Sequence, residues 1–216
     1  MYYLHIKDSN HLSPQTKYFT LQGKKMKIFN LSNSLNIPMN DRILEAGESV
    51  LKNSLQEYNK VFVQRIDIRL PLEFQQKGII PFNKRFIEKE KNAGYGPKYI
   101  IVREVSKNKN IHYHMALFLN GNKTENTYQH FKNAEIVLQN VIGPEYSVNG
   151  LIDRCDRGHR NGIMIHRNNP NQDDLNEVHR QLSYLAKRDQ KQNVKGKTFF
   201  TSRLNNKSSS NSTQKS

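Results

Sequence analysis

Two histidines stand two residues apart in the apolar segment IHYHMALFL, at positions 111–119. Alternate side chains of a β-strand point to the same face, so His112 and His114 would stand side by side. Two imidazoles in that arrangement suit the chelation of one divalent metal ion. Histidines that only hydrogen-bond on a sheet surface would show the same spacing, and that second interpretation stays open at this point.

A metal ion held by two histidines needs a further ligand, and two acidic residues are candidates for it. Glu104 precedes His112 by eight residues and lies on the preceding predicted strand. An odd number of turn residues would place Glu104 on the histidine face, and an even number would place it on the opposite face. Asp67, on the polar face of an earlier strand, is the alternative ligand. An ion pair with a strand arginine is the non-catalytic interpretation of Glu104.

A tyrosine in the segment QLSYLAKRDQK could supply a nucleophile. Tyr184 lies off the apolar stripe of a helix predicted over about residues 172–191, and four basic residues lie three, four or seven positions from it: Arg180, Lys187, Arg188 and Lys191. These offsets share a helix face, so the hydroxyl would stand in a basic stripe able to hold a phosphodiester. The alternative is a half-buried boundary tyrosine in a solvated, charged face.

The elements that must position these residues alternate in type along the chain. We predict a helix from an Asn40 cap to Tyr58, a strand at 61–71, a short helix capped by Asn83 and ending near Ala93–Gly94, a hairpin over 98–122, a helix over about 128–141, and two short strands, GLIDRC and GIMIHR, before the final helix. This order indicates an α+β domain with a mostly antiparallel sheet of about five strands. We expect helices to cover one face and the chemistry to lie on the other.

Composition and charge restrict the classes of function. The 216 residues are 35% hydrophobic, which suffices for one core, and Cys155 is the only cysteine, so no intrachain disulfide can form. No apolar run reaches the roughly 20 residues of a membrane span, and no signal peptide is visible, so we expect a soluble cytoplasmic protein. We assign 1–38 to a basic, loosely attached N-terminal extension, 39–203 to the domain, and 204–216 to a disordered polar tail.

The formal net charge of +15 favours a polyanionic partner. Residues 1–38 contribute +4 and residues 201–216 contribute +3, so the middle of the chain retains +8. Nucleic acid is the leading candidate. A basic turn between the two short strands adds three arginines as expected DNA contacts: Arg154, Arg157 and Arg160. A merely basic, soluble protein is the alternative.

The histidine pair and the tyrosine together carry a resemblance. His-hydrophobe-His in a strand, followed 70 residues later by Tyr-x-x-Lys in a helix, resembles two motifs of the HUH endonucleases that start rolling-circle replication. The phrases RIDIRLP, IHYHMALFLNG, GLIDRCDRGHRNGIMIHRN and SYLAKRDQK…FFTSR are more specifically similar to the YagK/YfjJ domain family of replication proteins from inovirus-type phages and prophages. The similarity covers about residues 55–203.

The resemblance implies an HUH/RRM-like fold, a metal site at His112 and His114, Tyr184 as nucleophile and Lys187 as a phosphate contact. Glu104 matches by spacing the acidic ligand of viral initiators. A single tyrosine in the helix motif indicates the single-tyrosine class.

The expected activity is sequence-specific nicking and rejoining of single-stranded DNA by a metal-dependent endonuclease, through a covalent phosphotyrosine. Mg²⁺ or Mn²⁺ is the expected cofactor. Single-stranded DNA or an origin hairpin is the expected partner, a host helicase is a further candidate, and no membrane is involved. The alternative is a phage- or prophage-derived module that binds single-stranded nucleic acid without catalysis. The origin sequence, the choice of metal and the oligomeric state stay open.

Overall fold

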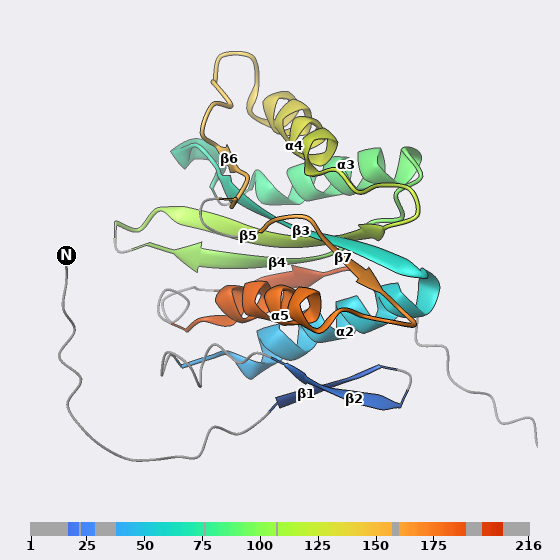
Figure 1. Ribbon diagram of the computed structural model, residues 1–216. Helices are drawn as coiled ribbons and strands as arrows, with labels where there is room; N and C mark the ends of the chain where they lie inside the picture. The colour runs from blue at the N-terminus through green and yellow to red at the C-terminus, as the bar shows by residue number, and fades with distance from the viewer. Residues whose placement is uncertain are drawn as a thin grey trace, which may run out of the picture.

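A computed structural model of the protein describes residues 17–21, 23–28, 38–75, 77–106, 108–156, 160–188 and 196–204. Its centre is a six-stranded sheet in the order β6-β3-β5-β4-β8, with β7 pairing β3 as well (Figure 1). Every pairing in this sheet is antiparallel. The strands are β3 (Lys60–Arg69), β4 (Lys98–Val105), β5 (Ile111–Asn120), β6 (Ile152–Asp153), β7 (Ile163–His166) and β8 (Phe199–Thr201). The predicted α+β class and mostly antiparallel sheet are confirmed.

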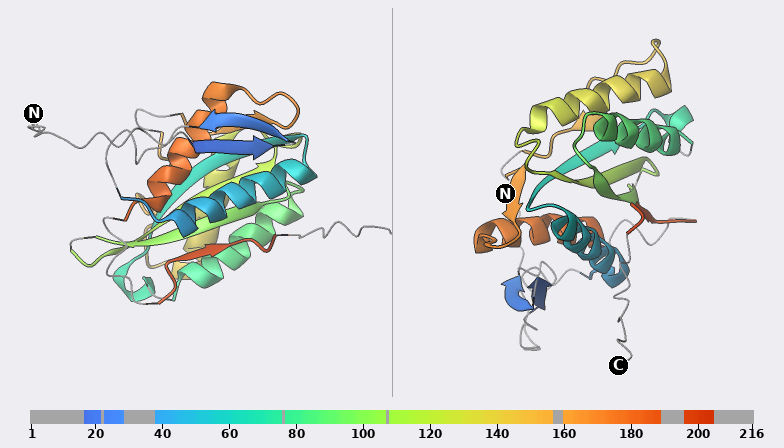
Figure 2. Two further views of the ribbon diagram at one scale, coloured as in Figure 1. Left: turned by 90° about the horizontal axis from the view of Figure 1, so that it is seen from below. Right: turned by 90° about the vertical axis from the view of Figure 1, so that its right-hand side faces the viewer.

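Helices cover both faces of the sheet, which corrects the expectation of one covered face. One layer consists of α3 (Ile79–Asn92) and α4 (Thr127–Ile142), and the other of α2 (Asp41–Glu57) and α5 (Gln172–Ala186); a short 3₁₀ helix, η1 (Leu72–Phe74), follows β3 (Figures 1 and 2). Each layer has its own hydrophobic core against the sheet. The physical reason is visible in β3, whose residues Val61–Gln64 are buried on both sides.

The second half of β3 behaves differently from the first. Ile66 and Ile68 stay buried on the α3–α4 side, whereas Arg65, Asp67 and Arg69 alternate with them and are only partly buried or exposed. Side chains of a strand alternate between faces, so these three residues share the α2–α5 face with His112 and His114. The helical cover on that face is therefore incomplete at one end of the sheet.

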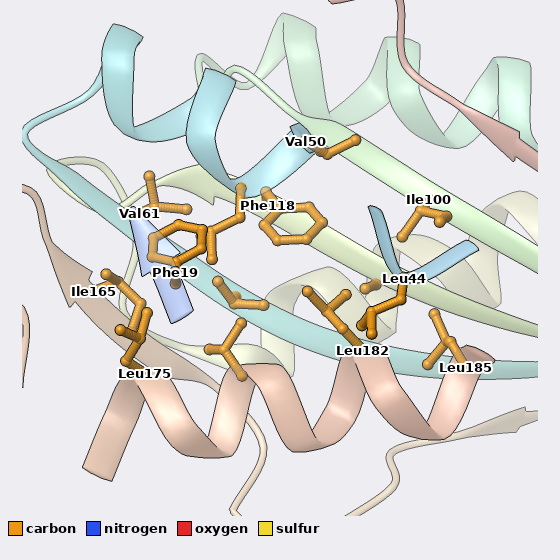
Figure 3. Packing of buried hydrophobic residues seen from close by; sticks show 14 of the residues in the cluster. Phe19, Leu44, Val50, Val61, Ile100, Phe118, Ile165, Leu175, Leu182 and Leu185 are labelled. Atoms are coloured by element: carbon orange, nitrogen blue, oxygen red, sulfur yellow. The ribbon is translucent and has the colours of Figure 1, made fainter. Parts of the chain in front are cut away.

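Apolar residues fix the rotation of α5 against the sheet. Leu175, Leu182 and Leu185 point into the core shared with α2 and the sheet (Figure 3). A stripe at this spacing is typical of an amphipathic helix that packs one face only. Tyr184 lies between two of the leucines in sequence and is half-buried at the margin of that core.

The predicted asparagine cap is correct for the start of α2 and wrong for the start of α3. The side chain of Asn40 caps α2 by accepting a hydrogen bond from the amide of Ile43, as predicted. Helix α3 begins at Ile79, four residues before the predicted cap at Asn83. Pro81 falls in its first turn, where a proline costs no intrahelical hydrogen bond, so the start lies upstream of the asparagine. The predicted end near Ala93–Gly94 is confirmed.

Part of the expected N-terminal extension belongs to the folded body. Strands β1 (Lys17–Leu21) and β2 (Lys24–Ile28) form an antiparallel hairpin beneath α2 and α5 (Figure 2). Phe19 is fully buried in the core and contacts the ring of His179 edge-on, at 5.0 Å between centroids. The loose attachment expected for 1–38 is therefore wrong for this hairpin, whose strands are too short to show a sustained period. Of the expected tail, 204–216, Leu204 is partly buried against the core, and residues 205–216 lie outside the described residues.

No helix in the part of the chain that the structure describes is long and apolar enough to cross a lipid bilayer.

Candidate active site

A pocket of about 230 Å³ opens where the helical cover of the sheet ends. Strands β3, β4 and β5 supply its floor, and the C-terminal end of α5 supplies one wall. The lining residues are the six catalytic and metal-binding residues predicted from the sequence together with an isoleucine and an arginine: Asp67, Ile68, Arg69, Glu104, His112, His114, Tyr184 and Lys187. The two motifs that lie far apart in the chain thus meet at one place.

Strand register decides the face of Glu104. The turn between β4 and β5 comprises residues 106–110, an odd number, and Glu104 is paired directly with His112. On the other side of β5, Asp67 is paired with His114. Both candidate acids therefore lie on the histidine face. The two residues predicted as alternative metal ligands lie on either side of the same strand, β5.

His114 lies between the two carboxylates. Its Nδ1 is 2.8 Å from Asp67 Oδ1, and its Nε2 contacts Glu104 Oε2. Burial alone would lower the pKa of His114, but the hydrogen bonds to Asp67 and Glu104 outweigh burial and raise that pKa above its usual value. Burial alone would raise the pKa of Asp67, but the hydrogen bond and charge of His114, together with Arg65, hold it well below its usual range. The cluster therefore concentrates negative charge on either side of one imidazole.

His112 is placed in a different electrostatic setting. Burial, followed by the positive charges of Arg69 and His114, lowers the pKa of His112. A histidine with a lowered pKa is neutral at physiological pH, which is the form that binds metal ions.

Tyr184 approaches this cluster from α5. Its ring centroid lies 5.9 Å from that of His114, with the planes at 88°. Two cations lie over the tyrosine ring: Arg65 Cζ at 4.0 Å and Lys187 Nζ at 4.1 Å from the centroid. The predicted association of Tyr184 with Lys187 is thus present in the geometry.

The helix carrying Tyr184 is shorter than predicted. It ends at Ala186, and Lys187 is its C-cap, so the predicted helix does not continue through Lys187 and Arg188; Lys191 lies outside the described residues. The reason is tertiary: Asn40 donates its amide to Ala186 O at 2.7 Å, and Arg188 donates its amide to Pro38 O at 3.0 Å. The segment before α2 therefore takes over hydrogen bonds that another helical turn would have used.

Arg65 is a residue of this cluster that the sequence did not predict as part of the site. Its Nε and Nη2 donate to the two oxygens of Asp67, at 2.9 and 2.7 Å, while the guanidinium faces the Tyr184 ring. The alternation of apolar and polar residues in RIDIRLP predicts that Arg65 and Asp67 share one face of the strand. Their proximity could therefore be inferred from the sequence. Nothing in the sequence pattern indicated the contact with α5.

The side chains that line the pocket are of the types that bind divalent cations. Two imidazoles and two carboxylates line one pocket, and these are ligands of divalent first-row metals. No three such side chains among the described residues are arranged to hold a metal ion, and His114 Nε2 and Glu104 contact each other directly. Metal binding would replace that contact. The contact of Asp67 with Nδ1 is the kind that orients a ligating histidine from behind.

Sequence comparison assigns the chain to a family. The model of the YagK/YfjJ C-terminal domain matches residues 22–202. The chain belongs to this family. No curated protein and no solved structure matches the chain. The family match begins between β1 and β2, so it covers the site, both helical layers and the second strand of the N-terminal hairpin.

The other basic residues predicted to contact DNA are dispersed over this family domain. Arg180 is paired with Glu177, and Arg160 with Asp174, so neither lines the pocket. Arg154 lies over the rings of Tyr128 and Phe131. Arg188 is exposed just beyond α5. Arg157 and Lys191 lie outside the described residues.

Two other tyrosines could have competed with Tyr184 as nucleophile. Tyr113 is buried on the opposite face of the sheet, and its hydroxyl donates to Gln75 O at 2.7 Å. Tyr128 is 52% exposed on α4, in the other helical layer. Neither ring lines the pocket, so Tyr184 is the tyrosine that the fold brings to the histidine cluster.

Proposed function

We propose that this protein is a replication initiator of the HUH endonuclease type that nicks and rejoins single-stranded DNA through a phosphotyrosine. One observation carries the proposal: Tyr184 on α5 and His114 on β5, 70 residues apart in the chain, have ring centroids 5.9 Å apart in one pocket. Covalent catalysis at a phosphodiester needs a nucleophile beside the groups that bind the phosphate. Among the described residues, Tyr184 is the one tyrosine that lines the pocket, which supports the single-tyrosine class.

Three residues would hold a divalent cation, Mg²⁺ or Mn²⁺: His112, His114 and Glu104. Asp67 supports His114 through Nδ1, so we assign it the orienting role and Glu104 the role of third ligand. When bound, the cation supplies Lewis-acid polarisation of a phosphate oxygen. The side chains on both sides of His114 fix the imidazole before a substrate arrives.

In the proposed reaction, one bond between phosphorus and oxygen forms and another breaks. The Tyr184 oxygen forms a bond to phosphorus and loses its proton, while the bond from phosphorus to the 3′ oxygen breaks and that oxygen gains a proton. The released 3′ hydroxyl can prime synthesis, and the phosphotyrosine retains the bond energy, so rejoining needs no ATP. Lys187, which lines the pocket and lies close to the ring, stabilises the negative charge that develops on the reacting phosphate and the phenolic oxygen.

The substrate class follows from charge and shape. The net charge of +15 favours a polyanion, and the partly open pocket faces solvent beside Arg69 and Lys187. We therefore propose single-stranded DNA or an origin hairpin as the substrate, with a host helicase as a further candidate partner.

A nicking assay with matched tyrosine variants tests this function. Wild-type protein, incubated with single-stranded DNA from its own replicon, should cut it with Mn²⁺ and not with EDTA. Tyr184→Phe should bind the DNA without cutting it, and Tyr128→Phe, which removes a phenol outside the pocket, should cut normally. Cutting by Tyr184→Phe at the wild-type rate would contradict the proposal. DNA binding without cutting by the wild type would favour the non-catalytic binding module instead.

A further inference from the structure

The outer edge of β3 has an interruption at Arg65. Strand β7 pairs with residues 60–63 of β3, and β6 pairs with residues 67–68. Among the described strands, neither reaches Arg65 on that side. An unpaired backbone amide and carbonyl inside a sheet cost free energy, so some other group must satisfy them.

The side chain of Asn161 fills this interruption. Its Oδ1 accepts from the Arg65 amide at 2.8 Å, and its Nδ2 donates to Arg65 O at 2.7 Å. The same Nδ2 also donates to Arg154 O. The side-chain amide of Asn161 thus takes the place of a neighbouring strand, because it bonds to both the amide and the carbonyl of Arg65.

The side chain of Arg65 is fixed as firmly as its main chain. Two parallel hydrogen bonds join it to Asp67, and only 12% of the side chain is exposed. Its guanidinium lies 4.0 Å from the centroid of Tyr184. Arginine can bind a carboxylate with two donors and at the same time stack on an aromatic face, which lysine cannot do because its ammonium is a point charge.

We infer that Arg65 is the positioning residue of Tyr184: held by Asn161 and Asp67, its guanidinium keeps the tyrosine ring in the pocket. The inference rests on the proposed function only for its catalytic consequence, since the contact itself is present in the protein alone. Tyr184 sits near the end of α5, where the helix stops two residues later, so the helix alone restrains the ring weakly. Displacement of a reacting group by about 1 Å can cost on the order of 100-fold in rate.

The structural part of this inference can be tested on the free protein. Tyrosine rings are labelled with ¹³C, and the order parameter of the Tyr184 ring is measured by NMR relaxation. Arg65→Met keeps much of the length and removes the guanidinium, so the ring should become more mobile. Arg69→Met is the matched control, because Arg69 lies on the same face of β3 and lines the same pocket without a stacking contact to Tyr184 in the structure. An unchanged ring order parameter in Arg65→Met would overturn the inference.

The catalytic consequence is measured under saturating DNA in a single turnover. Adduct formation per folded molecule should slow roughly 100-fold in Arg65→Met. Loss of the nearly buried ion pair with Asp67 should also lower the thermal midpoint, so the rate is measured at a temperature at which both proteins are folded. Arg65→Lys should remain closer to Arg65→Met than to the wild type, because it restores charge without the fork. Arg65→Lys at the wild-type rate would show that charge alone matters and would contradict positioning. If wild-type protein forms no adduct, the proposed function fails, while the NMR result still decides whether Arg65 holds the ring.

Discussion

Two histidine–carboxylate clusters lie on opposite faces of the same sheet. On the α3–α4 side, His130 Nδ1 is 2.6 Å from Glu90 Oε2, and both side chains are completely buried. Asn133 Nδ2 donates to the other oxygen of Glu90 at 2.8 Å, and Thr124 Oγ1 is 2.8 Å from His130 Nε2. All polar atoms of this histidine and this glutamate have partners, and no surface for a substrate remains on them.

The cluster around His114 uses the same chemical groups in a different setting. Its histidine contacts a carboxylate through each ring nitrogen, whereas His130 contacts one carboxylate and one threonine hydroxyl. Glu104, Asp67 and His112 line a pocket that a tyrosine shares. The comparison shows that a histidine–carboxylate pair is not in itself a site. Access to solvent, additional donors and a nearby tyrosine hydroxyl separate the proposed active site from the structural cluster. Substitutions in the two clusters should accordingly change different quantities.

The largest expected effect is on cleavage by variants of the pocket histidines. His112→Ala and His114→Ala should each abolish Mn²⁺-dependent nicking, because each removes one proposed ligand. DNA binding should largely persist, since most of the basic residues lie outside the pocket. Nicking and DNA affinity are measured side by side, with His166→Ala on the exposed end of β7 as a control. Nicking at the wild-type rate by both pocket variants would contradict the proposed metal site.

The next effect is on stability. His130→Ala leaves the Glu90 carboxylate buried without its histidine partner, and such a loss costs about 3–5 kcal/mol of folding free energy. Urea unfolding measures the change, and nicking per folded molecule at low temperature should stay normal. A stable His130→Ala protein that had lost nicking would break the distinction between the two clusters.

A smaller effect separates the two acids of the pocket. Glu104→Ala should weaken Mn²⁺ affinity more than Asp67→Ala, because the first removes a proposed ligand and the second removes the partner that orients His114. Loss of an orienting partner costs about 10- to 100-fold in metal affinity. Isothermal titration of both variants provides the comparison. A larger loss for Asp67→Ala would reverse the two assignments.

The smallest effect concerns single arginines that do not line the pocket. DNA affinity should fall with salt because phosphate contacts release counterions, and each contact adds about 0.7 to the log–log slope for single strands. Arg154→Ala should lower the slope by about that amount. Arg85→Ala is the control, since Arg85 bonds to Asn140 O between α3 and α4. An affinity independent of salt would contradict an electrostatic contact with DNA.

Much of the pocket could be predicted from the sequence because its parts are local. Strand alternation placed His112 and His114 together, and helical spacing placed Lys187 beside Tyr184. The sequence left the face of Glu104 open, and the register of β4 with β5 decides it. Arg65 could not be assigned a role, because that role depends on Asn161, 96 residues away, and on the packing of α5. The end of α5 and the buried N-terminal hairpin were missed for the same reason, since distant segments determine both.

Mass-spectrometric mapping of a protein–DNA adduct tests the central claim most directly. Wild-type protein is incubated with single-stranded DNA and Mn²⁺, denatured and digested, and the peptide carrying a nucleotide is identified. A covalent phosphodiester on Tyr184 is the predicted result, because this phenol is the one that the fold brings to the histidine cluster. DNA cleaved without any adduct, or an adduct on Tyr128 or another tyrosine, would contradict the assignment.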